Sequence, residues 1–389
     1  MDGLIKECYH NLKKLAIITF FIFLLLVIFV WKRQASVMSF DVKEKNRIKS
    51  LIYRESIDRV PVIPHIEAFA GRVCGIGTKE FYLNPRLSYE TQIKCQKLFG
   101  YDGGVGYGIP YGFTEEFGGK IEFPEAPVLG YPKIISKPVN CEKDVENLKI
   151  PDINKSFYGS KLLAFNKIAY ENGKGVNISA GSPMNIANGI AGIDLLLRWI
   201  IKKPELVHHI MRICTDYIII VAKRHAELFG AENISAGIAC PLECRSIMSS
   251  KMFEKFSLPY IKEIYDRFDN MGINISSVHL CGDHTKNLSY WKNDIVLKER
   301  TIVTTGTEFD LCDLGEELGE SYIIRGNLRN TTLQLGTPED VYNEAKELII
   351  KMKHFKGGYI LTPDCTLSFL TPLKNLTAMI NAADDYGAY

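Results

Sequence analysis

Hydrophobic positions along the chain fall into two kinds of run, and their alternation predicts strands followed by helices. Short runs rich in valine and isoleucine predict strands, and the amphipathic stretches between them predict helices. The predicted strands are residues 60–66, 176–180, 234–238, 273–280, 301–305, 322–325 and 358–361. The predicted helices include residues 85–98, 159–171, 204–228, 250–271 and 338–353.

The starts of two predicted helices support this reading. Pro204 and Pro338 each stand at a first helical turn, where proline is favoured. Thr337 precedes Pro338 as a capping residue. Strands that alternate with helices predict parallel βα units. Because no polar linker separates two halves, we expect one (β/α)8 TIM barrel, with its chemistry at the carboxyl ends of the strands.

The N-terminus has a different pattern from the rest of the chain. Residues 15–31 form an uncharged apolar run of 17 residues between lysine and arginine pairs at 13–14 and 32–33. A helix of this length spans about 26 Å, slightly less than a bilayer core, and the flanking basic side chains can extend it. We expect a transmembrane helix outside the barrel. A cleaved signal peptide or a buried core helix fits the pattern less well.

The sequence predicts two regions, and the first of them depends on whether the protein starts at Met1 or at Met38. Residues 1–37 form an N-terminal extension, and residues 44–389 form the barrel domain. Basic residues after the apolar run place a single-pass membrane protein with its catalytic domain in the cytoplasm. The chain from Met38 also reads as the opening of a soluble protein, and a start there predicts a cytoplasmic protein without the anchor. Ten cysteines without a disulfide framework agree with a reducing compartment.

Charge and one irregular segment narrow the class of protein. The 389 residues carry 47 basic and 45 acidic side chains, a net charge of +2, so no nucleic-acid partner is expected. Residues 100–120 hold eight glycines and five aromatic residues. This segment is interpreted either as a flexible surface connection or as a lid whose rings cover a flat ligand.

The clearest chemical pattern joins one predicted strand to a distant cysteine. Side chains alternate along residues 273–281, so His279 and Cys281 share one face at the strand end. Cys365 follows another predicted strand. Imidazole and thiolate groups suit zinc, and an enzyme site typically has three protein ligands and one open position. The alternative is that these cysteines are ordinary small apolar residues.

Other polar residues allow further interpretations. Glu243 lies in a loop after a strand and could supply a fourth ligand that substrate displaces. Cys240 and Cys244 form a Cys-x3-Cys pair that lacks two further partners for a second metal site. His65 and His284 are interpreted as ordinary polar groups near the rim of the barrel.

Several motifs resemble one known family, the uroporphyrinogen decarboxylases. They are residues 58–62 (DRVPV), 70–72 (AGR), 181–184 (GSPM), Ser250 with 258–260 (LPY), 279–282 (HLCG), 326–328 (GNL) and 370–379 (LTPLKNLTAM). The resemblance covers residues 44–386. It implies a (β/α)8 barrel of the uroporphyrinogen decarboxylase type.

Departures from the decarboxylases point to one branch of this family. The decarboxylases resemble one another in an Arg-x-x-x-Arg element, of which only Arg72 is present because Ala68 replaces the first arginine. Their pyrrole-binding aspartate falls in the region around Tyr107, and their later histidine is replaced by Cys365. The chain is instead similar to the corrinoid-dependent zinc methyltransferases, whose His-x-Cys…Cys set matches His279, Cys281 and Cys365.

The resemblance implies a zinc-dependent methyltransferase that takes a methyl group from methylcobalamin, a corrinoid, on a corrinoid protein. The acceptor would be a thiol such as coenzyme M, or tetrahydrofolate. We expect substrate contacts from Arg72, Tyr107, Ser182 and Asn327. Two alternatives are a uroporphyrinogen decarboxylase-type decarboxylase without metal, and a non-catalytic, membrane-tethered binder of a corrinoid or a corrinoid protein.

Overall fold

A computed structural model describes residues 46–125, 130–179 and 181–389. The predicted apolar helix at residues 15–31 lies outside these residues. In the described part of the chain, no single helix has both the length and the apolar composition needed to cross a membrane. Only the pair α9 (Pro183–Ala191) and α10 (Ile193–Lys202), which meet at a bend of 104°, passes that test together, by length and composition alone.

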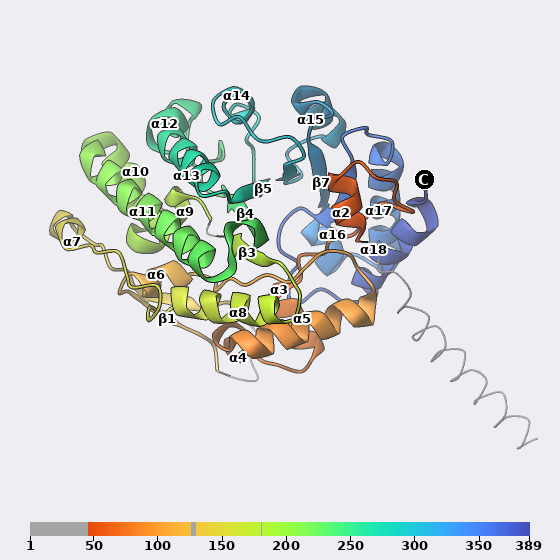
Figure 1. Cartoon of the computed structure of the whole chain (residues 1–389), viewed down its shortest axis with the longest axis horizontal. Helices are drawn as coiled ribbons and strands as arrows, with labels where there is room; N and C mark the ends of the chain where they lie inside the picture. Colours follow the sequence, from red (N-terminus) through yellow and green to blue (C-terminus); the bar gives the residue numbers. More distant parts are fainter. Residues whose placement is uncertain (1–45, 126–129, 180) are drawn as a thin grey trace, which may run out of the picture. The chain divides into compact units, whose positions relative to one another are not determined.

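Six parallel strands form the main sheet, in chain order. They are β3 (Val176–Ser179), β4 (Ile234–Ala239), β5 (Asn274–Leu280), β6 (Ile302–Thr305), β7 (Ile323–Leu328) and β8 (Tyr359–Pro363). A helix follows each strand, and Figure 1 shows the labelled strands at the centre with helices outside them. The sheet therefore confirms parallel βα units, which require a crossover between neighbouring strands.

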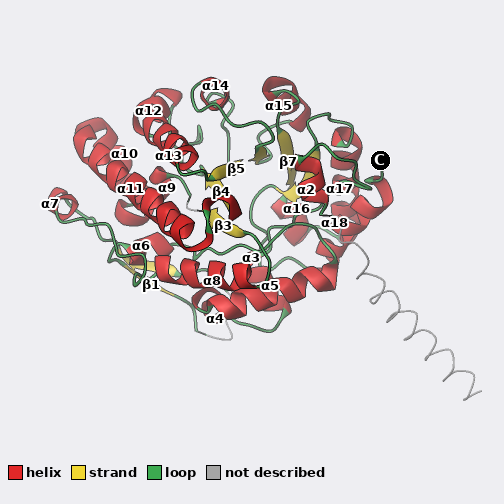
Figure 2. Ribbon diagram, in the orientation of Figure 1, coloured by secondary structure: helices red, strands yellow, loops and turns green. Residues whose placement is uncertain are grey.

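Helices account for most of the remaining structure (Figure 2). Before β3 they are α2 (Arg47–Ile52), α3 (Glu67–Val73), α4 (Thr78–Leu83), α5 (Pro85–Phe99), α6 (Gly112–Glu116), α7 (Glu142–Glu146) and α8 (Gly159–Glu171). After α10 they are α11 (Pro204–Phe229), η2 (Ala231–Asn233), α12 (Ser250–Phe256), α13 (Leu258–Asn270), α14 (Leu288–Asn293), α15 (Leu311–Leu318), α16 (Asn330–Leu335), α17 (Pro338–Met352) and α18 (Leu373–Tyr386). A small antiparallel pair, β1 (Lys120–Glu122) and β2 (Lys133–Ser136), lies outside the main sheet.

The predicted strand at residues 60–66 is wrong in its extent. Only Val62 pairs in parallel with Leu361 of β8, and the Ile63 amide donates to the Leu361 carbonyl oxygen at 3.0 Å. Pro61 and Pro64 have no N–H group to donate, so they interrupt a regular ladder. This short segment nevertheless extends the sheet beyond β8.

Two other predictions also need correction. The predicted helix at residues 250–271 is divided at Ser257 into α12 and α13, because Pro259 in the first turn of α13 cannot continue the preceding helix. Residues 100–120 are not a loose surface connection. The Gln92 side chain donates to the Gly106 carbonyl oxygen at 2.8 Å and accepts from its amide at 3.0 Å. Of the five aromatic rings in this segment, Tyr111 alone is exposed.

A small apolar cluster lies near the amino-terminal ends of three strands of the main sheet. Ile302 of β6, Ile323 of β7 and Ile360 of β8 are buried together with Leu51 of α2. These three isoleucines precede the carboxyl ends of their strands, so their cluster closes off one end of the inner face. Polar residues further along the same strands lie nearer the carboxyl ends.

His225 of α11 is a buried histidine that should make the stability of the protein depend on pH. Its side chain is fully buried, and Nδ1 lies 2.7 Å from the Val221 carbonyl oxygen while Nε2 lies 3.0 Å from the Asn166 amide nitrogen. Burial lowers the pKa of His225 to about 4 from 6.5. Between these two pH values the unfolded chain binds the proton and the folded chain does not, so stability falls as the pH falls through this window.

Because of this histidine, we expect the free energy of unfolding to fall by up to about 3 kcal/mol as the pH is lowered from 7 to 4. Urea unfolding at several pH values measures the effect. His225→Gln keeps a polar side chain but cannot titrate, so its stability should depend less on pH than that of the original chain. Equal pH dependence in the two proteins would contradict the assignment.

Candidate metal centre

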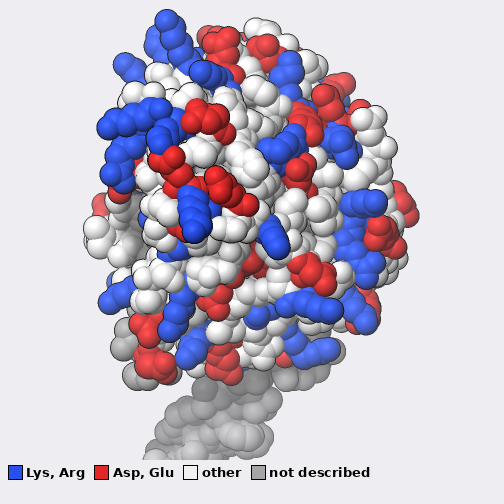
Figure 3. All heavy atoms as spheres, turned by 90° about the vertical axis from the view of Figure 1, so that its left-hand side faces the viewer, with Lys and Arg blue, Asp and Glu red and all other residues white. Residues whose placement is uncertain are grey.

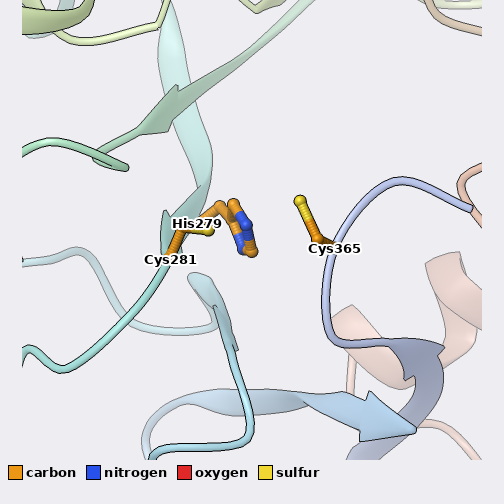
Figure 4. Close-up of side chains that lie close together, drawn as sticks. All are labelled: His279, Cys281 and Cys365. Carbon is orange, nitrogen blue, oxygen red and sulfur yellow. The ribbon is translucent and has the colours of Figure 1, made fainter. Parts of the chain in front are cut away.

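His279 and Cys281 reach the centre from the end of β5, and Cys365 reaches it from the loop after β8. Figure 4 shows Cys365 directed toward the other two side chains from the opposite side. One ligand atom from each residue lies within 4.8 Å of the other two. His279 and Cys281 are half-buried and Cys365 is exposed, so the centre is open to solvent on the Cys365 side. The structure therefore brings together the three predicted ligands.

The His279 ring has the property expected of a metal ligand. Both ring nitrogens are buried, and neither has a hydrogen-bond partner among the described residues. A buried polar atom without a partner is unfavourable, and such atoms in native proteins usually bind an ion or a water molecule or have a functional role. One imidazole nitrogen and two sulfur atoms match the ligands that zinc prefers. The residues present thus fit a zinc ion.

The protein environment also favours a thiolate at this centre. The Cys281 thiol and the His279 ring lie beside the Cys365 sulfur and lower the pKa of Cys365. The same contact between the sulfurs, with burial, raises the pKa of Cys281. This contact therefore favours the thiolate form of Cys365 over that of Cys281.

Several carboxyl groups lie near the three ligands. Charge interactions place Glu67 and Asp364 near Cys365, and Glu308 near Cys281. Glu243 is fully buried, with Oε1 unpartnered, and burial raises its pKa to about 7. Glu243 does not join the close group of three ligands. Sequence reasoning missed Glu308, although its place just after β6 was a usable signal.

The four residues expected to contact substrate are each engaged within the protein. Arg72 donates to the Thr371 carbonyl oxygen, and Tyr107 donates to the Tyr82 carbonyl oxygen. The Ser182 hydroxyl caps α9 and lies beside the Glu243 carboxyl group. The Asn327 amide donates to the carbonyl oxygens of Gly306, at 2.8 Å, and Phe309, at 3.0 Å. Their substrate contacts remain predictions.

The two remaining interpretations of polar residues have clear outcomes. Among the described residues, Cys240 and Cys244 belong to no group of three or more potential metal ligands. His284 is not at the rim, because it is fully buried and Nε2 lies 2.9 Å from the Cys240 carbonyl oxygen. His65 is exposed, and the charges of Arg325, His279 and Cys365 all act on its ring. It therefore lies close to the metal centre.

On the face shown in Figure 3, basic and acidic side chains lie among one another over most of the surface.

Comparison with known proteins places this fold and centre in one family. Residues 43–386 match the uroporphyrinogen decarboxylase (URO-D) family. This match spans most of the chain. The chain therefore belongs to the uroporphyrinogen decarboxylase family.

Relatives within this family share a more particular activity. Methylcobamide:CoM methyltransferase MtbA of Methanosarcina acetivorans is 29% identical over 262 residues, covering 66% of this chain and 72% of the relative. Methylcobamide:CoM methyltransferase MtaA of Methanosarcina barkeri is 24% identical, covering 88% of this chain and 98% of the relative. A solved methyltransferase from Methanosarcina mazei has the same fold, with a TM-score of 0.71 and 22% identity over 87% of this chain and 97% of that one. The comparisons confirm the expected branch, and the chain is an enzyme of the methyltransferase class.

Proposed function

We propose that the protein transfers a methyl group from a methylated corrinoid, carried by a corrinoid protein, to a thiol, with zinc held by His279, Cys281 and Cys365. The observation that carries this proposal is the close group of three ligand atoms, in which the buried nitrogens of His279 have no hydrogen-bond partner within the described part of the chain. The relatives named for methylcobamide and CoM support the donor and the thiol.

The ligand residues account for the chemistry of the acceptor. Zinc bound there would act as a Lewis acid that keeps an acceptor thiol deprotonated at neutral pH. The two cysteine sulfurs offset the charge of the cation, so a third sulfur remains electron-rich. With its proton released to solvent, the acceptor sulfur would attack the methyl carbon, so that a sulfur–carbon bond forms as the cobalt–carbon bond breaks and leaves its electron pair on cobalt. The exposed side of Cys365 gives the donor a route of approach.

The fold supports two further parts of this proposal. A closed (β/α)8 barrel is supported by the six parallel strands and by the contact of Val62 with Leu361. A barrel domain spanning residues 44–389 is supported by the family match and by the separation of Arg47–Tyr389 as a compact unit.

Metal content and methyl transfer test the proposal together. Purified protein should contain about one zinc per chain, the stoichiometry of a single tetrahedral site. It should demethylate methylcobalamin in the presence of a thiol, and a chelator that removes zinc should abolish this reaction. Folded original chain that is purified without bound zinc, or transfer that is unaffected by zinc removal, would exclude the proposed role of the three ligands. Replacing the thiol with tetrahydrofolate distinguishes the two acceptor classes.

The same assays separate the alternatives. A decarboxylase would turn over uroporphyrinogen whether or not a chelator is present, but Ala68 provides no cation for substrate carboxylates. A non-catalytic binder would associate with a methylated corrinoid protein and transfer no methyl group to a thiol or pterin. We expect neither result.

A further inference from the structure

Arg325 of β7 lies close to the metal centre and is a cation that has no partner in the described ranges of the chain. Its Nε atom is buried, and its side chain makes no hydrogen bond or ion pair with any described residue. Burial lowers the pKa of Arg325 to about 10, so the guanidinium group remains charged at neutral pH. Arg325 is half-buried, and a partly desolvated charge without a counter-ion is unfavourable, so proteins rarely keep one unless it has a function.

Packing around β7 shows which way this side chain points. A methyl group placed on Gly326 would lie 3.2 Å from Leu311 of α15, so Gly326 faces the outer helices. Side chains alternate along a strand, so Arg325 lies on the opposite, inner face. Ile323, two residues earlier, is on that same inner face and packs in the isoleucine cluster. Arg325 is therefore the next inner residue beyond the cluster.

The strand register brings Arg325 level with His279. His279 pairs with Thr304 of β6, and Thr304 pairs with Arg325. Two strand spacings separate the Cα atoms of His279 and Arg325, which is about 10 Å. Thr304 lies between them with its buried hydroxyl also unpartnered. The positive charges of Arg325 and His279 both act on His65, which indicates that His65 lies near both side chains.

We propose that Arg325 binds a sulfonate or carboxylate group of the methyl acceptor, while the acceptor sulfur lies at the His279–Cys281–Cys365 centre. This inference rests on the proposed function and adds the residue that selects the acceptor. The planar guanidinium group can bind two oxygen atoms of one oxyanion, and the site otherwise leaves its positive charge without a counter-ion.

The short separation also limits the size of the acceptor. Both the metal ligands and Arg325 project into the space between strands whose Cα atoms are about 10 Å apart, so only a few bonds separate sulfur from oxyanion. A short thiol acid satisfies this limit. Tetrahydrofolate does not, because an aminobenzoyl group separates its methyl-accepting nitrogen from its carboxylates.

Three thiols of similar size provide the experiment. Calorimetry would measure the binding of 2-mercaptoethanesulfonate, 3-mercaptopropionate and 2-mercaptoethanol to the zinc-loaded full chain. Arg325→Gln should weaken binding of the two anionic thiols by roughly 10- to 100-fold, as for a lost hydrogen bond to a charged group. Binding of neutral 2-mercaptoethanol should not change. Arg86→Gln, at an exposed position of α5, is the matched control and should leave all three affinities unaltered.

Several outcomes would overturn the proposal. Equal losses for the neutral and the anionic thiols in Arg325→Gln would show that Arg325 has only a structural role. If that variant does not fold, Arg325→Lys keeps the charge without the planar fork, and it should bind the anionic thiols with intermediate affinity. Equal affinity of the original chain for all three thiols would also refute an anion-binding site.

Methyl transfer separates this inference from the function on which it rests. If the original chain prefers anionic thiols through Arg325 but demethylates methylcobalamin with none of them, the anion site stands and the proposed function fails. If Arg325→Gln transfers methyl groups to all three thiols as well as the original chain does, the function stands and the anion site fails. Binding of ethanesulfonate, which has no thiol, reports the anion site without any transfer.

Discussion

Replacing Cys365 with serine is expected to remove zinc from the protein and to lower the rate of methyl transfer by more than about 100-fold. Loss of a residue that only hydrogen-bonds to a metal ligand typically lowers metal affinity or activity by about 10- to 100-fold, and loss of the ligand itself should cost more. The serine hydroxyl is not deprotonated at neutral pH and is a poor zinc ligand. Cys365 is exposed in a loop, so the substitution should leave the fold intact. Metal analysis and demethylation of methylcobalamin measure the two effects.

Cys141→Ser is a suitable control for this variant. Cys141 is an exposed cysteine just before α7, and serine is a favourable residue at a helix start. It should keep zinc, activity and stability. Equal zinc loss in both variants, or zinc retained in Cys365→Ser, would show that Cys365 is not a ligand.

Most strands could be predicted from the sequence because buried apolar residues recur along them at short intervals. Residues 234–238 were predicted and β4 spans Ile234–Ala239, and residues 273–280 were predicted and β5 spans Asn274–Leu280. Residues 60–66 carry a similar apolar composition, but two prolines remove the donors that a ladder needs. Composition indicated burial at that segment and could not indicate how the backbone pairs.

The metal centre was predictable only in part from residue spacing. Strand alternation placed His279 and Cys281 on one face, but the approach of Cys365 depends on the curvature of a sheet in which β5 and β8 are not neighbours. Its place after another predicted strand made it a candidate third ligand, and the family resemblance supported that assignment. Glu308 is a single acid in a loop, and Arg325 is a single base in an apolar strand. A charge within a buried strand was the available signal for Arg325, since such residues are seldom buried without a partner.

A second large effect is expected away from the centre, at Glu116 of α6. This carboxylate is only 5% exposed and accepts hydrogen bonds from the Tyr158 amide at 2.5 Å, the Tyr217 hydroxyl at 2.8 Å and the Ser156 hydroxyl at 2.5 Å. It also accepts from the Gly159 amide at the start of α8. The positive end of the α8 dipole further favours a negative charge there.

Glu116→Ala should therefore lower the free energy of unfolding by about 3 kcal/mol, because buried donors on two backbone amides and a tyrosine lose their acceptor. Glu116→Gln should cost only about 1 kcal/mol, since its carbonyl oxygen still accepts from the backbone and the hydroxyls can rotate to accept from its amide. Urea unfolding compares both variants with Glu122→Ala, at an exposed position of β1. If Gln and Ala destabilise equally, the negative charge is what the site requires; if neither destabilises, the hydrogen bonds at Glu116 do not support the fold.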